Sequence, residues 1–178
     1  YTYMIPYSLT IRANISFIGE GSGVTILDFM ETSNHIIMVG SLSNIIKNNI
    51  FRDFTVQNST AAAAIDIDYA DFWRMQNIEV TSCNGYGIRI NHSRFFNLTD
   101  TQGELNTTGG IHIQGDLTSR ESRNGTFINC ECDNNTGTGV SILDTGGGAV
   151  VDMVFTNCRA IENGGDGFDI TQTVATSD

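Results

Sequence analysis

Apolar and polar residues alternate along most of the chain, and each alternating run follows a polar turn that contains Gly or Asn. Such alternation over four to eight residues predicts half-buried β-strands, because successive side chains of a strand point to opposite faces. No helical periodicity is sustained, which argues against helical repeats. The apolar pairs that recur with one polar residue between them are Ile65/Ile67, Ile88/Ile90, Ile111/Ile113, Val140/Ile142 and Phe168/Ile170.

The alternating runs belong to a repeat that occurs at residues 51–68, 73–91, 95–114, 126–143 and 154–171. Short strands with Gly and Asn turns, repeated every 20–50 residues or so, are typical of a solenoid. Leucine is too scarce for a leucine-rich repeat. We therefore predict an all-β fold: a right-handed, single-stranded parallel β-helix of about six or seven coils, formed by residues 1–178 as one domain, with coils ~4.8 Å apart.

Three further features follow from this register. Turn residues should stack at one corner, since Asn tolerates left-handed backbone; they are Asp53, Asn77, Asn97, Asn129 and Asn157. An earlier coil at 13–29 should point Ile15, Phe17, Val24 and Ile26 inward, followed by an apolar strand at 36–40. Cys130 and Cys158 share one inward position, as buried thiols or as a disulfide between adjacent coils.

Polar residues between the inward pairs must point outward. One predicted column contains Asp66, Arg89, His112, Ser141 and Asp169, and the next contains Asp68, Asn91, Gln114, Leu143 and Thr171. Neighbours within a column should lie about 5 Å apart, because each coil adds one strand spacing. Tyr86 and His92 flank this patch from the turns of the Arg89 coil.

The outward patch contains groups suited to carbohydrate chemistry. His112 can act as a base and Tyr86 as an acid, while Arg89 can neutralise a substrate carboxylate beside Asp66. Asp66 and Asp68 could instead be the acid and base of a glycoside hydrolase. Asp68, Asn91, Gln114 and His92 are the candidate substrate-binding residues. The alternative is a solvated strand face, on which Asp66 and Arg89 form a stacking ion pair.

Charge and composition narrow the set of partners. A formal charge of −11 disfavours nucleic acid, which needs a basic face. No apolar run reaches the ~18 residues that would span a bilayer, so we expect no membrane insertion. Seven N-x-S/T sequons suggest a glycosylated exterior protein, or chance in an Asn- and Thr-rich repeat. They occur at Asn14, Asn58, Asn91, Asn97, Asn106, Asn124 and Asn134.

We expect neither a metal nor another cofactor. The four cysteines form no paired CxxC motifs, which disfavours a zinc ribbon. The only hint of calcium is "GGDGFD" (164–169), one partial match to a calcium-binding nonapeptide. The chain begins at Tyr1 without a signal peptide, and neither end has an obvious cap. It is therefore expected to be a piece of a longer protein that forms a homo-oligomer or assembles end to end.

Residues 72–170 resemble the catalytic module of mannuronan C5-epimerases, within the pectate-lyase-like β-helices. The resemblance rests on "IEVTSCNGYGIRINHS" and, further along the chain, "NCRAIENGGDGFDI". It implies a Gly-Tyr-Gly turn leading into a strand with a catalytic Asp and, two residues later, a His. Tyr86 matches the family's catalytic Tyr, but Arg89 replaces the Asp and Asn91 replaces the His, with His92 one position later.

These features predict an extracellular, cell-surface or virion-surface β-helix that recognises a polysaccharide or other glycan. Its groove would follow the outward ladder, and it would act there as a polysaccharide lyase, an epimerase or a hydrolase. Viral tail spikes share the fold and often bind glycans without the epimerase residues. The alternative function is therefore a non-catalytic virion or cell-surface protein with a structural or adhesive role.

Overall fold

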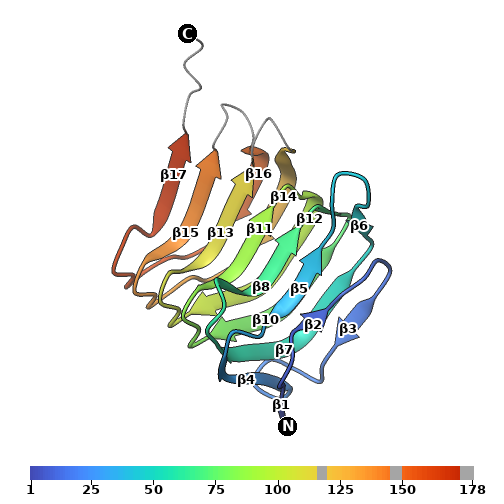
Figure 1. Cartoon of the computed structure of the whole chain (residues 1–178). Helices are drawn as coiled ribbons and strands as arrows, with labels where there is room; N and C mark the ends of the chain where they lie inside the picture. Colours follow the sequence, from blue (N-terminus) through green and yellow to red (C-terminus); the bar gives the residue numbers. More distant parts are fainter. Residues whose placement is uncertain (116–119, 145–149, 173–178) are drawn as a thin grey trace.

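The chain winds as a parallel β-solenoid in the computed structural model, which describes residues 1–115, 120–144 and 150–172 (Figure 1). All pairings between its strands are parallel, and successive coils pair strand on strand. This confirms the predicted all-β fold. Within the described ranges, no helix is long and apolar enough to cross a membrane.

Two sheets form the walls of the solenoid. Sheet A contains β1 (Thr2–Met4), β3 (Ser16–Ile18), β4 (Ile26–Thr32), β6 (Ile46–Lys47), β7 (Ile50–Ser59), β9 (Ala70–Asp71), β10 (Arg74–Thr81), β12 (Arg94–Glu104), β14 (Ser122–Ile128) and β16 (Val150–Thr156). Sheet B contains β2 (Leu9–Thr10), β5 (Ile36–Val39), β8 (Ala63–Asp68), β11 (Tyr86–Asn91), β13 (Gly109–Gly115), β15 (Thr138–Asp144) and β17 (Phe168–Gln172).

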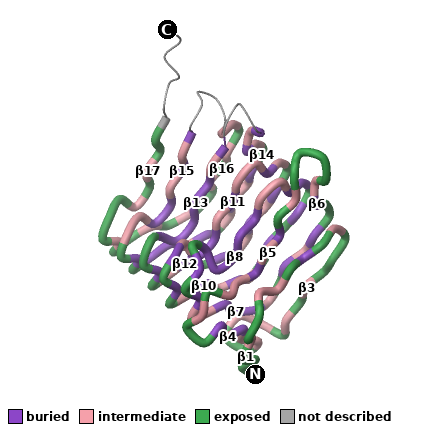
Figure 2. The backbone as a smooth tube through the Cα atoms, in the orientation of Figure 1, coloured by how far each residue is buried: buried purple, intermediate pink, exposed green. Residues whose placement is uncertain are grey.

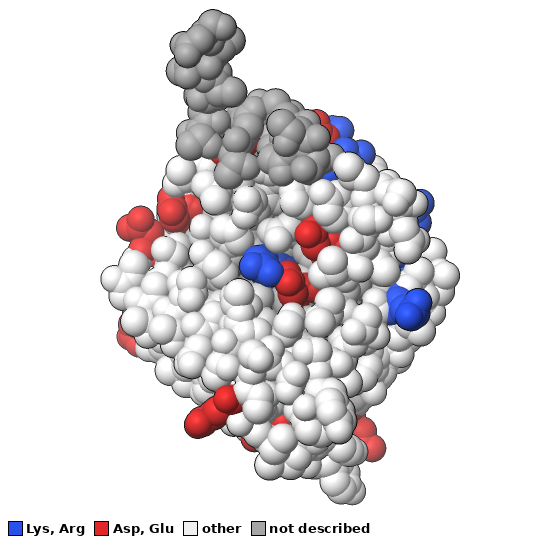
Figure 3. All heavy atoms as spheres, viewed as in Figure 1, with Lys and Arg blue, Asp and Glu red and all other residues white. Residues whose placement is uncertain are grey.

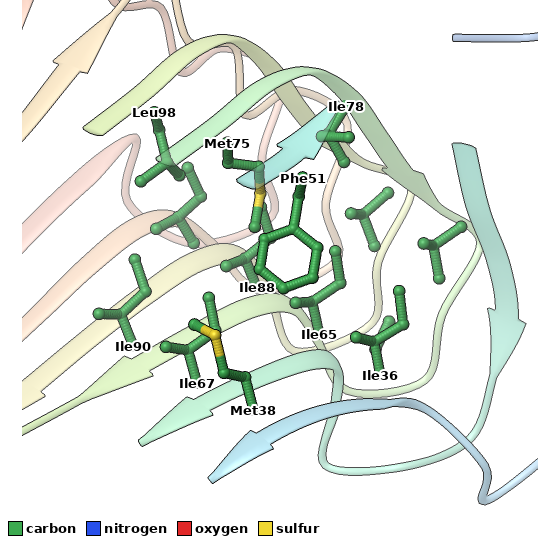
Figure 4. Close-up of a cluster of buried hydrophobic side chains, with 14 of the residues drawn as sticks. Ile36, Met38, Phe51, Ile65, Ile67, Met75, Ile78, Ile88, Ile90 and Leu98 are labelled. Carbon is green, nitrogen blue, oxygen red and sulfur yellow. The ribbon is translucent and has the colours of Figure 1, made fainter. Parts of the chain in front are cut away.

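The core lies between two facing ladders of apolar side chains (Figure 4), and the buried stretches of the strands are purple in Figure 2. From sheet B, Ile65, Ile88 and Ile111 stack in register and are almost fully buried. Phe51 and Met75 face them from sheet A. Each fully buried side chain of this kind contributes roughly 1.5–3 kcal/mol, so the repeated inward pairs account for much of the stability of the coils.

Two parts of the predicted register are wrong. In β4 the inward residues are Leu27 and Phe29 rather than Ile26, while Ile15 and Val24 are 40% and 45% exposed. This part lies at the end of the solenoid, where coils do not enclose it on both sides. The alternation of apolar and polar residues therefore gave the wrong prediction of which side chains point inward. Phe17 does pack against the core, and the strand expected at 36–40 is β5.

The second error concerns the stacked turn residues. Asn97 lies within β12 opposite Arg74, and Asp100 occupies the corner position instead. The reason is that Leu98, rather than Phe96, pairs with Phe127. The observed column has left-handed backbone throughout, and side-chain hydrogen bonds link several of its members; it contains Asp53, Asn77, Asp100, Asn129 and Asn157.

A second left-handed column, here called the edge column, runs along the opposite corner of sheet A. Its members have φ between 54° and 62° and are Asn14, Asn48, Phe72, Phe95, Asn124 and Asp152. Strand register and hydrogen bonds place them on consecutive coils. Asn and Asp tolerate this conformation, whereas strained backbone of this kind costs of order 1–3 kcal/mol per residue. The two Phe residues are therefore exceptions within the column.

All four cysteines are free thiols; Cys130 is buried, as the first of the two alternatives has it, whereas Cys158 is only partly buried. Burial raises the pKa of Cys83 to about 11 and that of Cys130 to about 12. Burial also raises the pKa of Cys132, which is fully enclosed. These thiols therefore stay protonated at neutral pH and act as small core residues.

A ladder of buried Asn side chains closes the turns that lead into sheet B. Asn106 Oδ1 accepts the Cys83 N–H at 3.1 Å, and Asn106 Nδ2 donates to the Val80 carbonyl at 3.1 Å. Asn135 Oδ1 in turn accepts the Asn106 N–H, and Asn163 Oδ1 accepts the Asn135 N–H. Because Asn106 is fully buried, its sequon is not available for a glycan in the folded protein.

Replacing Asn106 with Ala should lower the free energy of unfolding by about 1–3 kcal/mol, because a buried N–H and a buried carbonyl lose their partner. Urea unfolding measures the change. Asn84→Ala, at an exposed position of a neighbouring turn, is the matched control and should shift stability by less than about 0.5 kcal/mol. Equal stability of the two variants would show that the ladder is not stabilising.

Candidate functional site

Both predicted outward columns lie on the outer face of sheet B. In the first column, Arg89 pairs with Asp66 on one side and with His112 on the other. Ser141 and Asp169 continue the column, and Asp68, Asn91, Gln114, Leu143 and Thr171 form the second. The face turned toward the viewer in Figure 3 is mostly uncharged, with a basic group between acidic groups near its centre.

Asp66 and Arg89 form a two-pronged ion pair. Arg89 Nε donates to Asp66 Oδ1 at 2.9 Å, and Arg89 Nη2 donates to Oδ2 at 2.6 Å. The hydrogen bonds that Arg89 donates to Asp66 raise the pKa of Arg89, whose side chain stays 30% exposed. Asp66 thus occupies two guanidinium donors, and a ligand carboxylate would meet a charge that is already partly compensated.

Tyr86 and His112 stack as parallel rings, with centroids 4.5 Å apart and planes 19° apart. Tyr86 pairs in register with Gly109, where an added Cβ would lie 3.2 Å from the tyrosine ring. Because Gly109 has no side chain, the Tyr86 ring has room beside His112. Tyr86 and His112 are both predicted site residues, but the contact between their rings was not predicted.

His112 is buried, with 6% of its surface exposed. Its Nδ1 lies 3.3 Å from Ser141 Oγ and its Nε2 lies 3.4 Å from Gln114 Oε1. Burial lowers the pKa of His112, and the Arg89 charge lowers it further, against an opposing effect of Gln114. The imidazole is therefore neutral at neutral pH, with Nε2–H directed to Gln114 and Nδ1 able to accept a proton.

His92 forms an acid–imidazole pair on the same face. Its Nδ1 lies 2.7 Å from Asp68 Oδ1, and its ring stacks on Tyr69 with centroids 4.7 Å apart. Strand β11 ends at Asn91 and His92 has φ 44°, so the shift of one residue does not turn this side chain inward. Tyr69 is the residue that sequence reasoning missed. Tyr69 occupies the turn position of the preceding coil that is equivalent to His92, and both residues have positive φ. This equivalence within the repeat is the signal that could have identified it.

The candidate residues thus form three groups instead of one converging triad: Asp66 with Arg89, Tyr86 with His112, and Asp68 with His92. His112 bonds to Ser141 and Gln114, while Arg89 bonds to Asp66. Asn91 lies between Asp68 and Gln114 in register, and its buried Oδ1 accepts no hydrogen bond from the described residues. Every predicted site residue therefore lies on or beside three consecutive coils, but side-chain pairing divides them.

Other features do not add to this face. Three clefts lie elsewhere, the largest being about 430 Å³ at the N-terminal end between residues such as Tyr3, Phe17 and Leu27. The described ranges contain no group of three or more His, Cys, Asp or Glu that could hold a metal. In the "GGDGFD" turn, Asp169 Oδ1 accepts a hydrogen bond from Thr171.

Residues 34–177 match the family described as "Right handed beta helix region". The chain belongs to this right-handed β-helix family. No curated protein sequence matches it. The family match agrees with the handedness and fold class predicted from the repeats.

Solved structures similar to this β-helix come from a virus and a bacterium. ORF18 of Geobacillus virus E2 matches with a TM-score of 0.73 and 15% identity, covering 90% of this chain and 33% of that protein. The A-module of Azotobacter vinelandii mannuronan C-5 epimerase AlgE4 matches at 0.72 and 19%, covering 94% and 48%. The AlgE6 A-module matches at 0.68 and 22%, covering 94% and 47%.

These similarities confirm the fold on which the resemblance to mannuronan C5-epimerases rested. The β-helix spans between a third and a half of the length of the structures it matches. At identities below 25%, the likeness concerns the path of the chain and does not extend to activity.

Replacing His112 with Gln should remove one source of acid sensitivity. The folded pKa of His112 lies below the unfolded value of about 6.5, so the unfolded chain binds the proton more readily. The stability contributed by neutral His112 is present above about pH 6.5 and is lost as the pH falls toward the folded pKa. Urea unfolding at about pH 7.5 and about pH 5 should therefore show a smaller acid loss in the variant than in the wild type.

His35→Gln is the matched control, because among the described residues the His35 ring hydrogen-bonds only to the Ser33 carbonyl, through Nδ1. An acid loss as large in His112→Gln as in the wild type would contradict the assignment of a buried neutral imidazole.

Proposed function

We propose that this β-helix binds a polysaccharide along the outer face of sheet B and cleaves it by elimination, outside the cell or on a virion surface, without a bound cofactor. One observation carries the proposal: Arg89, His112 and Tyr86 lie on adjacent coils of one face, with the two rings stacked. Similarity in fold to carbohydrate epimerase modules supports the class of ligand.

The arrangement suits a uronate-containing chain. Arg89 would pair with the carboxylate and stabilise negative charge as the adjacent C5–H is removed. Neutral His112 would take that proton, and the electron pair would form a C4–C5 double bond as the C4–O bond breaks. Tyr86 would protonate the leaving oxygen, and proton exchange with water would then remove the proton from His112 and return one to Tyr86.

The stacking favours elimination over epimerisation within this scheme. Tyr86 and His112 stack on the outer face of two adjacent strands, so both would approach a bound sugar from the sheet side. Elimination can use an acid and a base on one face of the ring. Inversion at C5 requires proton donation from the opposite face, where the described residues place no partner for His112.

A second candidate is a glycan-binding or structural β-helix of a virion or cell surface, without catalysis. The occupation of Arg89 by Asp66 favours it, since the ion pair stabilises adjacent coils even without a ligand. The likeness in fold to a viral protein favours it too. The two candidates differ in whether bound glycan is cleaved.

The test is incubation of the purified protein with acidic and neutral polysaccharides, followed by absorbance of unsaturated uronate products and by a binding assay. Wild type should cleave an acidic polysaccharide, and His112→Gln should slow cleavage by about 10²–10⁴-fold while binding persists. Asp169→Asn, in the same column but two coils further on, is the matched control and should keep full activity.

Binding without cleavage by the wild type would identify the second candidate. If neither acidic nor neutral polysaccharide binds, both glycan-binding functions are wrong and only the structural role of the second candidate is left.

A further inference from the structure

Two aromatic residues interrupt the edge column. Four of its six members are Asn or Asp, and the middle two are Phe72 and Phe95. Their rings stack with centroids 4.9 Å apart and planes 3° apart, yet 53% and 44% of their surfaces remain exposed. Large apolar side chains thus stand in solvent on backbone that favours Asn.

The fold does not need these rings for its core. The next residue of each coil, Trp73 or Phe96, points inward, and those two rings form a separate buried stack. Asn48 and Asn124 show that a small polar residue meets the backbone requirement on the coils above and below. Strained positions that keep exposed aromatic residues are candidates for ligand contact.

Basic residues flank the two rings. Lys47, Arg94 and Arg123 belong to the column that directly precedes the edge column, and Arg74 follows Phe72 after one residue. These are four of the nine Lys and Arg in a chain of net charge −11. Most of the Lys and Arg visible in Figure 3 lie along its right-hand edge, on the side where Figure 1 places β6.

The acidic neighbours cancel this charge only in part. Asp71 interrupts the basic column, but a buried ion pair with Arg120 at 2.6 Å holds both of its carboxylate oxygens. Glu121 Oε2 lies 3.6 Å from Arg94 Nη2 and 3.3 Å from Arg123 Nη1. Asp152 Oδ2 lies 3.5 Å from Arg123 Nη2. Lys47 and Arg74 make no ion pair with the described residues, so the strip keeps an excess of positive charge.

We propose that this aromatic–basic strip, formed by Lys47, Phe72, Arg74, Arg94, Phe95 and Arg123, is a second binding surface for an acidic polysaccharide. The C–H faces of sugar rings can pack on the exposed phenyl groups, while carboxylates accept hydrogen bonds from the guanidinium groups. Single-stranded nucleic acid is the alternative ligand, because bases can also stack on the outer ring faces; the proposed function, which calls for a uronate-containing chain, favours the polysaccharide.

The inference shares the class of ligand with the proposed function but none of its residues. An acidic polymer held by the strip would be retained whether or not sheet B cleaves it. The two proposals therefore succeed or fail separately.

The test is the double variant Phe72→Asn, Phe95→Asn, which installs the residue common elsewhere in the edge column. It should bind immobilised polygalacturonate at least about tenfold more weakly, because truncation of exposed anchors removes their contact energy. Its Tm should not fall, because backbone strain is relieved. Leu105→Asn is the matched control: Leu105 has φ 55° and is 56% exposed outside the strip, so this variant should bind like the wild type.

Charge is tested with Arg74→Gln, which should also weaken polygalacturonate binding, and with added salt, which should weaken it in the wild type. Neutral dextran, a single-stranded DNA oligomer and anionic vesicles are the comparison ligands, and each should bind more weakly than polygalacturonate. If the double Phe variant misfolds, Arg74→Gln decides the matter, because this exposed side chain is not in the core.

Unchanged polygalacturonate binding by a folded double variant, or by Arg74→Gln, would overturn the inference. Dextran, DNA or vesicles binding as tightly as polygalacturonate would overturn the choice of ligand. In His112→Gln and Arg89→Gln the strip should still retain polygalacturonate, so loss of cleavage there bears only on sheet B.

Discussion

In-register hydrogen bonding between parallel strands of consecutive coils is the interaction on which the other features depend. Each strand pairs with a strand of the preceding coil and with a strand of the following coil. Residues at equivalent positions of successive coils therefore form columns that run along the solenoid. The same pairing that buries Ile65, Ile88 and Ile111 together also places Asp66, Arg89 and His112 together on the outside. Core and candidate site are thus opposite faces of one ladder.

The stacking of equivalent residues into columns lets the fold tolerate left-handed backbone at its corners. In the part of the chain that the structure describes, twenty non-glycine residues have positive φ; eleven of them are Asn or Asp, and several of these bond to the next coil through their side chains. The Asn106–Asn135–Asn163 ladder does the same inside the turns. Against that regular background, Phe72 and Phe95 are visible as exceptions, and an exception within a repeat is better evidence of ligand contact than exposure alone.

At the candidate site, contacts between neighbouring coils divide the outward side chains into separate pairs. Neighbouring coils bring opposite charges close enough to pair, and Asp66 consequently holds Arg89 in two hydrogen bonds. The same closeness stacks Tyr86 on His112 and places Asp68 beside His92. A ligand would therefore compete with contacts between coils, and the strength of those contacts limits what the face can bind.

The sequence by itself determined the fold class, the sheet B register and the membership of both outward columns, because inward and outward residues alternate and a Gly lies at or directly before the start of β11, β13, β15 and β17. It misplaced Asn97 and the faces of Ile15, Val24 and Ile26, where bulky residues or the solenoid's end break that alternation. Only the tertiary structure decided which outward side chains bond, that Tyr69 joins His92, and that His92 returns to the outer face. Those outcomes depend on side-chain conformations and strand ends, which contacts between coils set and which no single repeat contains.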